Sequence, residues 1–330
     1  LIRSIVSWNT LIIGHTEHGQ GHQALNYFEQ MRSEGLLPNA ITFTCVLKAC
    51  GIIGHIDKAK YIHNEIVSSG FLENSILLGN ALVDMYAKCG MLEKAHQVLQ
   101  ELSIRNVVSW STLMSGCLQQ DQGEAALNCF RSMQNDGLSP DVVTLTCILK
   151  ACGCTGAIVK GKQIHEEIVI NGLFGKDIVL CNALVDMYTK CGLLAKAKKV
   201  IEEDHLPNII SWNTLISGYA KQRQAHEALK SFVSMESKGL CPDEVTLLCL
   251  LSACGHSGLL DEAQMLYENM TNMYGIIPDL QHHTCMVSCL GRFGHINEAT
   301  SMIKRMSFCV NDSSVWLALL GSCEKWGNVE

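Results

Sequence analysis

The stretch NALVDMYAKCG at Asn80–Gly90 returns as NALVDMYTKCG at Asn182–Gly192, with ten of eleven residues identical across 102 positions. It carries an amide, a carboxylate, an amine and a thiol, which are groups that active sites use. A chain has no chemical need for two copies of an active site, however, and self-similarity at a fixed period is the signature of a repeat architecture. The duplicated stretch therefore indicates the fold before it indicates any chemistry.

Two further families of segments share this spacing. One reads VSWNTLI, VSWSTLM and ISWNTLI, at Val6–Ile12, Val108–Met114 and Ile210–Ile216. The other reads ITFTCVLKACG, VTLTCILKACG and VTLLCLLSACG, at Ile41–Gly51, Val143–Gly153 and Val245–Gly255. Aligned together, the families divide the chain into units of 35, 36 and 31 residues in rotation. We expect a truncated unit at 1–4, a different segment at 312–330, and nine units at 5–39, 40–75, 76–106, 107–141, 142–177, 178–208, 209–243, 244–279 and 280–311.

Each unit is expected to form a helical hairpin. Apolar residues recur at helical spacing in two stretches, and a glycine and a proline follow the second stretch in four units, which is typical of helix termination. These are Gly35/Pro38, Gly137/Pro140, Gly239/Pro242 and Gly275/Pro278. A single hairpin cannot bury its apolar face alone, so neighbouring hairpins must stack. We predict an all-α fold, a right-handed α-solenoid; the unequal unit lengths argue against a tetratricopeptide array, whose period is 34 residues.

The composition narrows the function classes. The chain is 48% hydrophobic with a mean hydropathy of +0.15, and its 25 basic and 32 acidic side chains give a net charge of -7. That balance argues against a simple electrostatic nucleic-acid binder, although a solenoid can segregate charge onto one face. Seventeen cysteines, an odd number set mostly in apolar runs, indicate free thiols in a reducing compartment. No apolar run is long enough for a membrane span, and no targeting segment is visible, so we expect a fragment of a longer chain without a membrane partner.

These motifs resemble those of the pentatricopeptide repeat family, in the land-plant subclass that alternates standard, long and short motifs. VSWNTLI followed by GLLPN is similar to the standard motif, TFTCVLKAC with GKQIH at Gly161–His165 to the long motif, and NALVDMYAKCG to the short motif. The tail DSSVWLALLGSCEKWGNVE at Asp312–Glu330 resembles the start of the E extension of RNA-editing factors. The resemblance implies sequence-specific binding of single-stranded RNA in a mitochondrion or plastid, to position cytidines for C-to-U editing.

The resemblance also implies which residues read the bases. In this family the fifth and last residues of a unit read one base together: a short Ser or Thr leaves room for a purine, whereas Asn fills that room and favours a pyrimidine. The implied pairs are Asn9/Asn39, Asn80/Asn106 and Asn182/Asn208 for a pyrimidine, Ser111/Asp141 for G, Asn213/Asp243 for U and Thr284/Asn311 for A. The long motifs carry Thr44/Ser75, Thr146/Asp177 and Leu248/Asp279, for which no base is assigned. The implied target is Y-N-Y-G-N-Y-U-N-A, read from the 5′ end.

Two further sets of residues are expected to contact RNA. An aliphatic second residue would sandwich the base, and the residues in question are Val6, Leu77, Val108, Val179 and Ile210; Gln281 departs from this pattern. The thirteenth residue is basic in four units, at Lys88, Lys190, Lys221 and Arg292. These are candidates for phosphate contacts, the alternative being ordinary solvated side chains. Asp84 lies four residues before Lys88 and is expected to orient it or pair with it.

No catalytic site is predicted. A zinc deaminase needs H-x-E and P-C-x-x-C; H-x-E occurs at His63/Glu65 and His165/Glu167, but the two copies are 102 residues apart in the repeat, and no C-x-x-C exists in the sequence. Packing is the favoured interpretation of the other candidate groups, including burial of Cys285 and Cys289 in a helix face. These groups are His282/His283/Cys285/Cys289, Cys152/Cys154, and Trp8, Trp110 and Trp212 in the hairpin cores. We therefore expect neither a metal nor a cofactor.

The function that follows is a non-catalytic RNA-recognition array, with a deaminase either beyond Glu330 or on another protein acting in trans. The alternative is a helical-repeat scaffold whose groove holds a peptide, which would need apolar anchors in place of the polar fifth residues.

Overall fold

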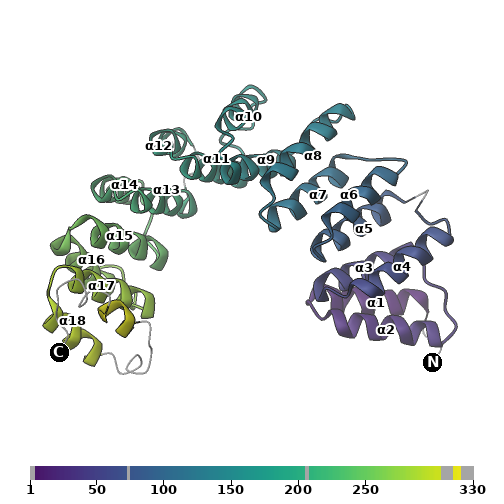
Figure 1. Ribbon diagram of the computed structural model, residues 1–330, viewed down its shortest axis with the longest axis horizontal. Coiled ribbons are helices and arrows are strands. Elements are labelled where there is room, and N and C mark those ends of the chain that lie inside the picture. Colours follow the sequence, from purple (N-terminus) through teal and green to yellow (C-terminus); the bar gives the residue numbers. More distant parts are fainter. Residues whose placement is uncertain (1–3, 73–74, 205–207, 306–314, 321–330) are drawn as a thin grey trace. The chain divides into compact units, whose positions relative to one another are not determined.

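The computed structural model describes residues 4–72, 75–204, 208–305 and 315–320, and the regular elements in these ranges are α-helices (Figure 1). In chain order they are α1 (Ile5–Glu17), α2 (Gly21–Ser33), α3 (Ala40–Ile53), α4 (Ile56–Ser68), α5 (Ile76–Lys88), α6 (Leu92–Glu101), α7 (Val107–Gln119), α8 (Gly123–Asn135), α9 (Val142–Thr155), α10 (Ile158–Ile170), α11 (Ile178–Lys190), α12 (Leu194–Glu203), α13 (Ile209–Lys221), α14 (Ala225–Ser237), α15 (Glu244–Ser257), α16 (Leu260–Asn272), α17 (Leu280–Arg292) and α18 (Ile296–Arg305). Residues 315–320 are also helical.

The chain divides into two compact units, Leu1–Gly161 and Lys162–Glu330. In the first unit, α1, α3, α5, α7 and α9 pack each against the next, and α2, α4, α6 and α8 each bridge the two neighbouring odd-numbered helices (Figure 1). In the second unit, α11, α13, α15 and α17 form the same kind of row, with α12, α14 and α16 bridging and α18 against α17. The prediction of an all-helical stack of helix pairs is confirmed.

The start of each odd-numbered helix is set by the residue before it. Asn39, for example, accepts a hydrogen bond from the backbone N–H of Thr42 at 3.0 Å, and Asp243 accepts one from Thr246 at 2.8 Å. Such a cap satisfies one of the orphan amides of the first turn and stabilises a helix by about 1 kcal/mol. The odd-numbered helices consequently begin at the first residues of the nine units expected above: Ile5, Ala40, Ile76, Val107, Val142, Ile178, Ile209, Glu244 and Leu280.

The predicted helix ends are also present. Gly35, Gly137, Gly239 and Gly275 have φ of 78°, 75°, 78° and 66°. This left-handed conformation is strained for a residue with a Cβ, so glycine terminates the second helix before the proline.

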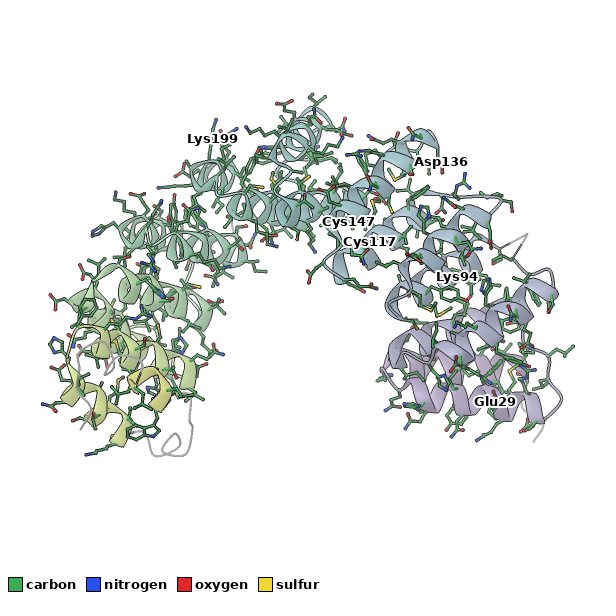
Figure 2. All side chains as sticks on the ribbon, in the orientation of Figure 1. Glu29, Lys94, Cys117, Asp136, Cys147 and Lys199 are labelled. Carbon is green, nitrogen blue, oxygen red and sulfur yellow. The ribbon has the colours of Figure 1, made fainter. Side chains whose placement is uncertain are left out.

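Large side chains between the two helices of a pair form the core. Trp8, Trp110 and Trp212 are 1%, 3% and 0% exposed, so they belong to the hairpin cores as expected and are not available to stack on bases. Many cysteines are buried among them; Cys117 and Cys147 lie inside the first unit (Figure 2), and every cysteine in the described ranges is a free thiol. No helix in the described part of the chain combines the length and apolar character that a membrane crossing requires.

Candidate nucleic-acid interface

The fifth residue of a unit and the cap of the following odd-numbered helix meet in space. The Nδ2 of Asn9 donates to Asn39 Oδ1 at 3.3 Å, and that of Asn213 donates to Asp243 Oδ1 at 2.9 Å. The direction is reversed in a third pair, where Asn208 Nδ2 donates to Asn182 Oδ1 at 2.9 Å. The two predicted base-reading residues of these units therefore form one polar group at the same end of the odd-numbered helices.

The pair Asn80/Asn106 is joined through a third residue. The hydroxyl of Ser109 lies 2.6 Å from Asn80 Oδ1 and 3.0 Å from Asn106 Oδ1. All four asparagine fifth residues thus contact the start of the next odd-numbered helix, and Asn9 is only 6% exposed.

Ser111 behaves differently. Its hydroxyl donates to the carbonyl of Val108 in its own helix at 3.1 Å, so it does not reach Asp141. Both residues instead line a cavity of about 330 Å³, together with Val108 and Val143. The predicted G-reading pair therefore lines the same open space as two aliphatic side chains.

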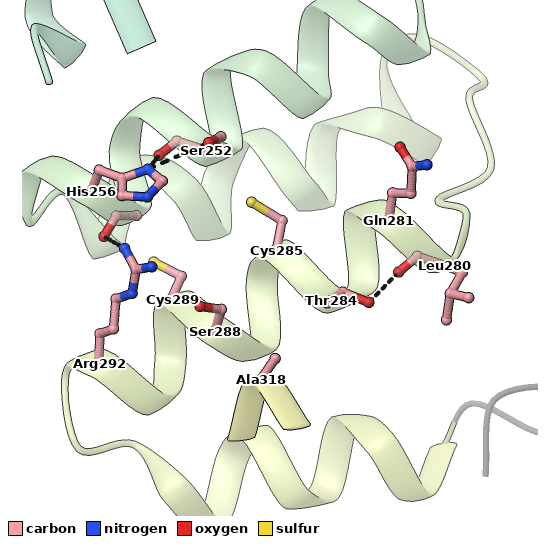
Figure 3. Close-up of a pocket in the computed structure, with 11 residues that line it drawn as sticks. Ser252, His256, Leu280, Gln281, Thr284, Cys285, Ser288, Cys289, Arg292 and Ala318 are labelled. Carbon is pink, nitrogen blue, oxygen red and sulfur yellow. Dashed lines mark hydrogen bonds between the residues drawn. The ribbon is translucent and has the colours of Figure 1, made fainter. Parts of the chain in front are cut away.

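Threonine fifth residues also bond to their own helices. The hydroxyls of Thr44 and Thr146 each donate at 2.8 Å to the carbonyl four residues earlier, and that of Thr284 donates to Leu280 at 2.7 Å. Thr284 lines a second cavity, of about 530 Å³, along α17 (Figure 3). Leu248 lines a third, of about 500 Å³. Asn311, the predicted partner of Thr284, lies outside the described residues.

Within each of the two compact units, the second residues form a row of exposed aliphatic side chains. Val6, Leu77, Val108, Val179 and Ile210 are between 52% and 69% exposed, although each begins a helix with a buried face. Three residues that were not predicted share their position and their exposure, namely Ile41, Val143 and Val245 at 52%, 57% and 54%. The signal was already in the sequence, since all three are second residues of the long motifs; Gln281 remains the polar departure.

The four basic thirteenth residues differ in their surroundings. Lys88 pairs with Asp84 at 2.7 Å, as expected, and Lys190 pairs with Asp186 at 2.8 Å. Arg292 donates to the carbonyl of Gly255 at 3.3 Å (Figure 3). Lys221 forms no hydrogen bond or ion pair with any other described residue, and lines the cavity beside Leu248.

The repeated H-x-E segments have structural partners. The Nδ1 atoms of His63 and His165 lie 2.8 Å from the hydroxyls of Tyr86 and Tyr188, and Glu65 pairs with Arg32 at 2.8 Å. Burial lowers the pKa of both histidines and raises the pKa of Tyr86 to about 12, so each contact joins a neutral phenol and a neutral imidazole. These groups hold successive helices together.

The cluster on α17 is not a ligand set. His282 lies 2.5 Å from Asp279 as part of the helix cap, and His283 lies 2.5 Å from the hydroxyl of Tyr267. Cys289 is buried as expected, but Cys285 is only partly buried; both line the cavity beside Thr284, between α17 and α15 (Figure 3). Burial raises the pKa of both thiols to about 11, which keeps them protonated. Within the described ranges, no three His, Cys, Asp or Glu side chains are placed to hold a metal ion.

Two family models match this chain. The model of the PPR repeat family matches residues 3–52, 105–154 and 207–256. The PPR repeat model matches residues 41–71, 80–107, 179–203, 245–273 and 282–308. Together these matches cover most of the sequence.

Curated relatives are longer than this sequence. A pentatricopeptide repeat-containing protein of Arabidopsis thaliana, At1g03540, is 35% identical over 320 residues, covering 97% of this chain and 51% of the relative. Another from the same plant, At1g06140, described as mitochondrial, is 35% identical over 322 residues, covering 98% of this chain and 57% of the relative. The chain therefore spans about half the length of the curated relatives that it matches.

Among solved structures, the pentatricopeptide repeat protein PPR10 in complex with an 18-nt psaJ RNA element shares the fold. The TM-score is 0.75 with 23% identity, over 97% of this chain and 46% of that one. The structure of PPR10 from maize gives a TM-score of 0.69 with 19% identity, over 99% of this chain and 52% of that one.

Proposed function

Because this chain belongs to the pentatricopeptide repeat family, we propose that it binds single-stranded RNA one base per repeat, with the fifth and last residues of each unit reading the base. The recognition modules would be the nine units from 5–39 to 280–311, each binding one base. The complex of PPR10 with an RNA element supports the partner class.

One observation carries this proposal. The lining of the cavity of about 330 Å³ includes Val108 and Val143, the second residues of successive units, together with Ser111 and Asp141. Two exposed aliphatic side chains offer apolar contact to both faces of a planar base, and the serine and the aspartate offer hydrogen bonds to its edge. The space is present where the fifth residue is serine, as expected for a purine site.

The row of second residues extends this arrangement along each unit of the structure. An exposed valine, leucine or isoleucine on successive odd-numbered helices is poorly explained by folding, because burial would be more favourable by about 1.5–3 kcal/mol for each side chain. Stacked bases would cover these side chains. Lys221 is the most available candidate for a phosphate contact, whereas Lys88 and Lys190 share their charge with an aspartate.

The biological role within this proposal is C-to-U editing in a mitochondrion or plastid. The alternation of three unit lengths supports it, as does the mitochondrial description of a relative. The E-type extension at 312–330 lies almost entirely outside the described residues. A deaminase would be supplied by a further part of the same protein or in trans.

The test is a binding series with the nine-base RNA Y-N-Y-G-N-Y-U-N-A and its single-base variants. The Ser111→Asn variant is expected to move the preference at the fourth base from G to a pyrimidine, because the amide fills the cavity. Ser132→Asn, on α8, is the matched control and leaves the preference unchanged.

An unchanged fourth-base preference in Ser111→Asn would contradict the residue assignment. A wild-type chain without salt-sensitive RNA binding would instead favour the peptide scaffold, with the exposed aliphatic row as its anchor surface.

A further inference from the structure

A buried hydroxyl lies behind every asparagine fifth residue. It belongs to the third residue of the following odd-numbered helix, and it donates to the side-chain Oδ1 of the asparagine. The contacts are Thr42 to Asn9 at 2.7 Å, Ser109 to Asn80 at 2.6 Å, Thr246 to Asn213 at 2.6 Å, and Ser211 to Asn182. The four hydroxyl residues are at most 2% exposed, so they cannot contact RNA themselves.

The hydroxyl proton has two acceptors within reach. Thr246 Oγ1 lies 2.6 Å from Asn213 Oδ1 and 2.8 Å from Asp243 Oδ1. Thr42 shows the same order, 2.7 Å to Asn9 and 2.9 Å to Asn39, and Ser109 shows 2.6 Å to Asn80 and 3.0 Å to Asn106. A hydroxyl has a single proton to donate, and in each case the fifth-residue amide is the nearer acceptor.

This bond settles which way the amide points. With Oδ1 engaged by a buried hydroxyl, the Nδ2 end is left toward the interface. Nδ2 carries two protons, of which Asn213 uses one on Asp243 Oδ1. The remaining proton is a donor suited to an acceptor such as the O2 of uracil or cytosine. An amide turned by 180° would present an acceptor instead, which suits the amino group of adenine.

The hydroxyl is absent behind the long motifs. The corresponding third residue is Leu78 after Thr44, Leu180 after Thr146, and His282 after Leu248. Ser111 is followed by Thr144, whose hydroxyl donates to Asp141 Oδ1 at 2.7 Å and not to the fifth residue. Thr144 therefore keeps the helix-capping role of this hydroxyl without any amide to orient.

We propose that Thr42, Ser109, Ser211 and Thr246 are positioning residues for base selectivity, each holding the amide of an asparagine fifth residue so that its Nδ2 faces the base. This inference rests on the proposed function. It adds a third residue to each asparagine-containing reading pair, one that never touches the base.

The experiment compares Thr246→Val with Thr144→Val. Both substitutions preserve the shape of a buried side chain and remove a capping hydroxyl, but only the first frees an amide. Affinities are measured for RNAs with U or A at the seventh base, and with G or C at the fourth. Thr246→Val is expected to lower the U-to-A affinity ratio about three- to tenfold, in proportion to one lost hydrogen bond. Thr246→Ser restores the ratio, and Thr144→Val leaves the G-to-C ratio within about twofold.

The readouts separate positioning from stability. Thr246→Val is expected to lose somewhat more thermal stability than Thr144→Val, since Thr246 Oγ1 also accepts from the backbone N–H of Asp243 at 3.2 Å, so both affinity ratios are measured at a temperature where each variant is folded. A Thr246→Val chain that keeps the wild-type U-to-A ratio would overturn the inference alone. A wild-type chain without preference for U would overturn the base assignment, and this inference with it. If Thr246→Val does not fold, Ser109→Ala provides the same measurement at the third base, because Ser109 holds the Oδ1 of Asn80.

Discussion

The repeats that begin with α7 and α13 have the same helix caps, and they differ at the fifth residue, which is Ser111 in one and Asn213 in the other. Both first helices are capped by an asparagine, and both are followed by an aspartate cap and a threonine, Asp141/Thr144 and Asp243/Thr246. Ser111 bonds to its own helix and leaves a cavity, whereas Asn213 extends to both Asp243 and Thr246. The fifth residue thus bonds to the aspartate in one repeat and not in the other, and we expect this side chain to decide which base fits beside the aspartate.

The comparison predicts that exchanging the fifth residue changes which base the repeat prefers. Asn213→Ser should turn the α13 site into a copy of the α7 site, because the aspartate and the threonine are already in place. We expect the seventh-base preference to change from U to G, with the ratio of the two affinities moving by about a hundredfold. Competition binding with RNAs that differ only at the seventh base measures this change.

The fourth base is the internal control for this exchange, since the α7 site is untouched. Retention of the U preference in Asn213→Ser would mean that Asp243 and not Asn213 selects the base.

The difference between the two sites was visible in the sequence, but its geometry was not. Repeat phase, helix boundaries and the exposed second residues follow from spacing, because each is a periodic property of the chain. The different roles of the Thr246 and Thr144 hydroxyls cannot be read from any such periodicity. Both look like ordinary third residues of a capped helix, and the contact that sets Thr246 apart, its hydroxyl 2.6 Å from Asn213, comes from the structure.

Cys285 illustrates a second limit. Helical periodicity placed it on a buried face, yet it is only partly buried, since how far a face is covered depends on the neighbouring helix. The ion pairs of Lys88 and Lys190 were accessible to sequence reasoning because both partners lie on one helix, four residues apart.

In both repeats a glycine of the first helix packs closely against the preceding odd-numbered helix. A Cβ added at Gly218 would lie 2.5 Å from Thr189 Cγ2, and one at Gly116 would lie 2.4 Å from Ala87 Cβ. Gly218→Ala and Gly116→Ala are therefore each expected to lower the free energy of unfolding by about 1–3 kcal/mol. Gly14 occupies the same repeat position with nothing within 4 Å, so Gly14→Ala is the matched control.

Urea denaturation of the three variants measures this effect. Equal midpoints for Gly14→Ala and Gly218→Ala would show that the odd-numbered helices separate easily, which would undermine the fixed geometry that both sites require.

Acid should act on the α13 site through Asp243. Although burial raises the pKa of this carboxyl, hydrogen bonds from Thr246 and Asn213 outweigh it and hold the pKa below the usual value. A depressed pKa means that the stabilisation is complete above the unfolded pKa of about 3.9, and is lost as the pH falls through the lower folded value. The U preference should accordingly be constant from pH 8 to pH 5.

Asp243→Asn isolates this contribution, because asparagine is an equally good helix cap that does not titrate in this range. We expect wild type to lose about 1 kcal/mol more than the variant on acidification below pH 4, measured by urea denaturation. A variant and a wild type with parallel pH profiles would show that the carboxylate contributes no acid-labile stability.

The smallest expected effect concerns the loops that follow α7 and α13. Asp121 and Arg223 have φ of 55° and 58°, whereas the equivalent residue after α1 is Gly19, with φ of 73°. A left-handed backbone is unfavourable for a residue with a Cβ by about 1–2 kcal/mol, partly offset by the entropy of glycine in the unfolded chain. Asp121→Gly and Arg223→Gly should therefore each raise the free energy of unfolding by about 0.5–1 kcal/mol.

Both variants are expected to be more stable than wild type, but their affinities for RNA are expected to differ. Arg223 lines the cavity beside Leu248 and Lys221, so its loss removes a cation near the expected RNA path. Asp121→Gly removes an anion instead. Arg223→Gly should thus weaken RNA binding and flatten its dependence on salt, while Asp121→Gly should not weaken it. If both variants bind like wild type, the cavity beside Leu248 lies away from the phosphates, and the α13 repeat contacts its nucleotide through the base alone.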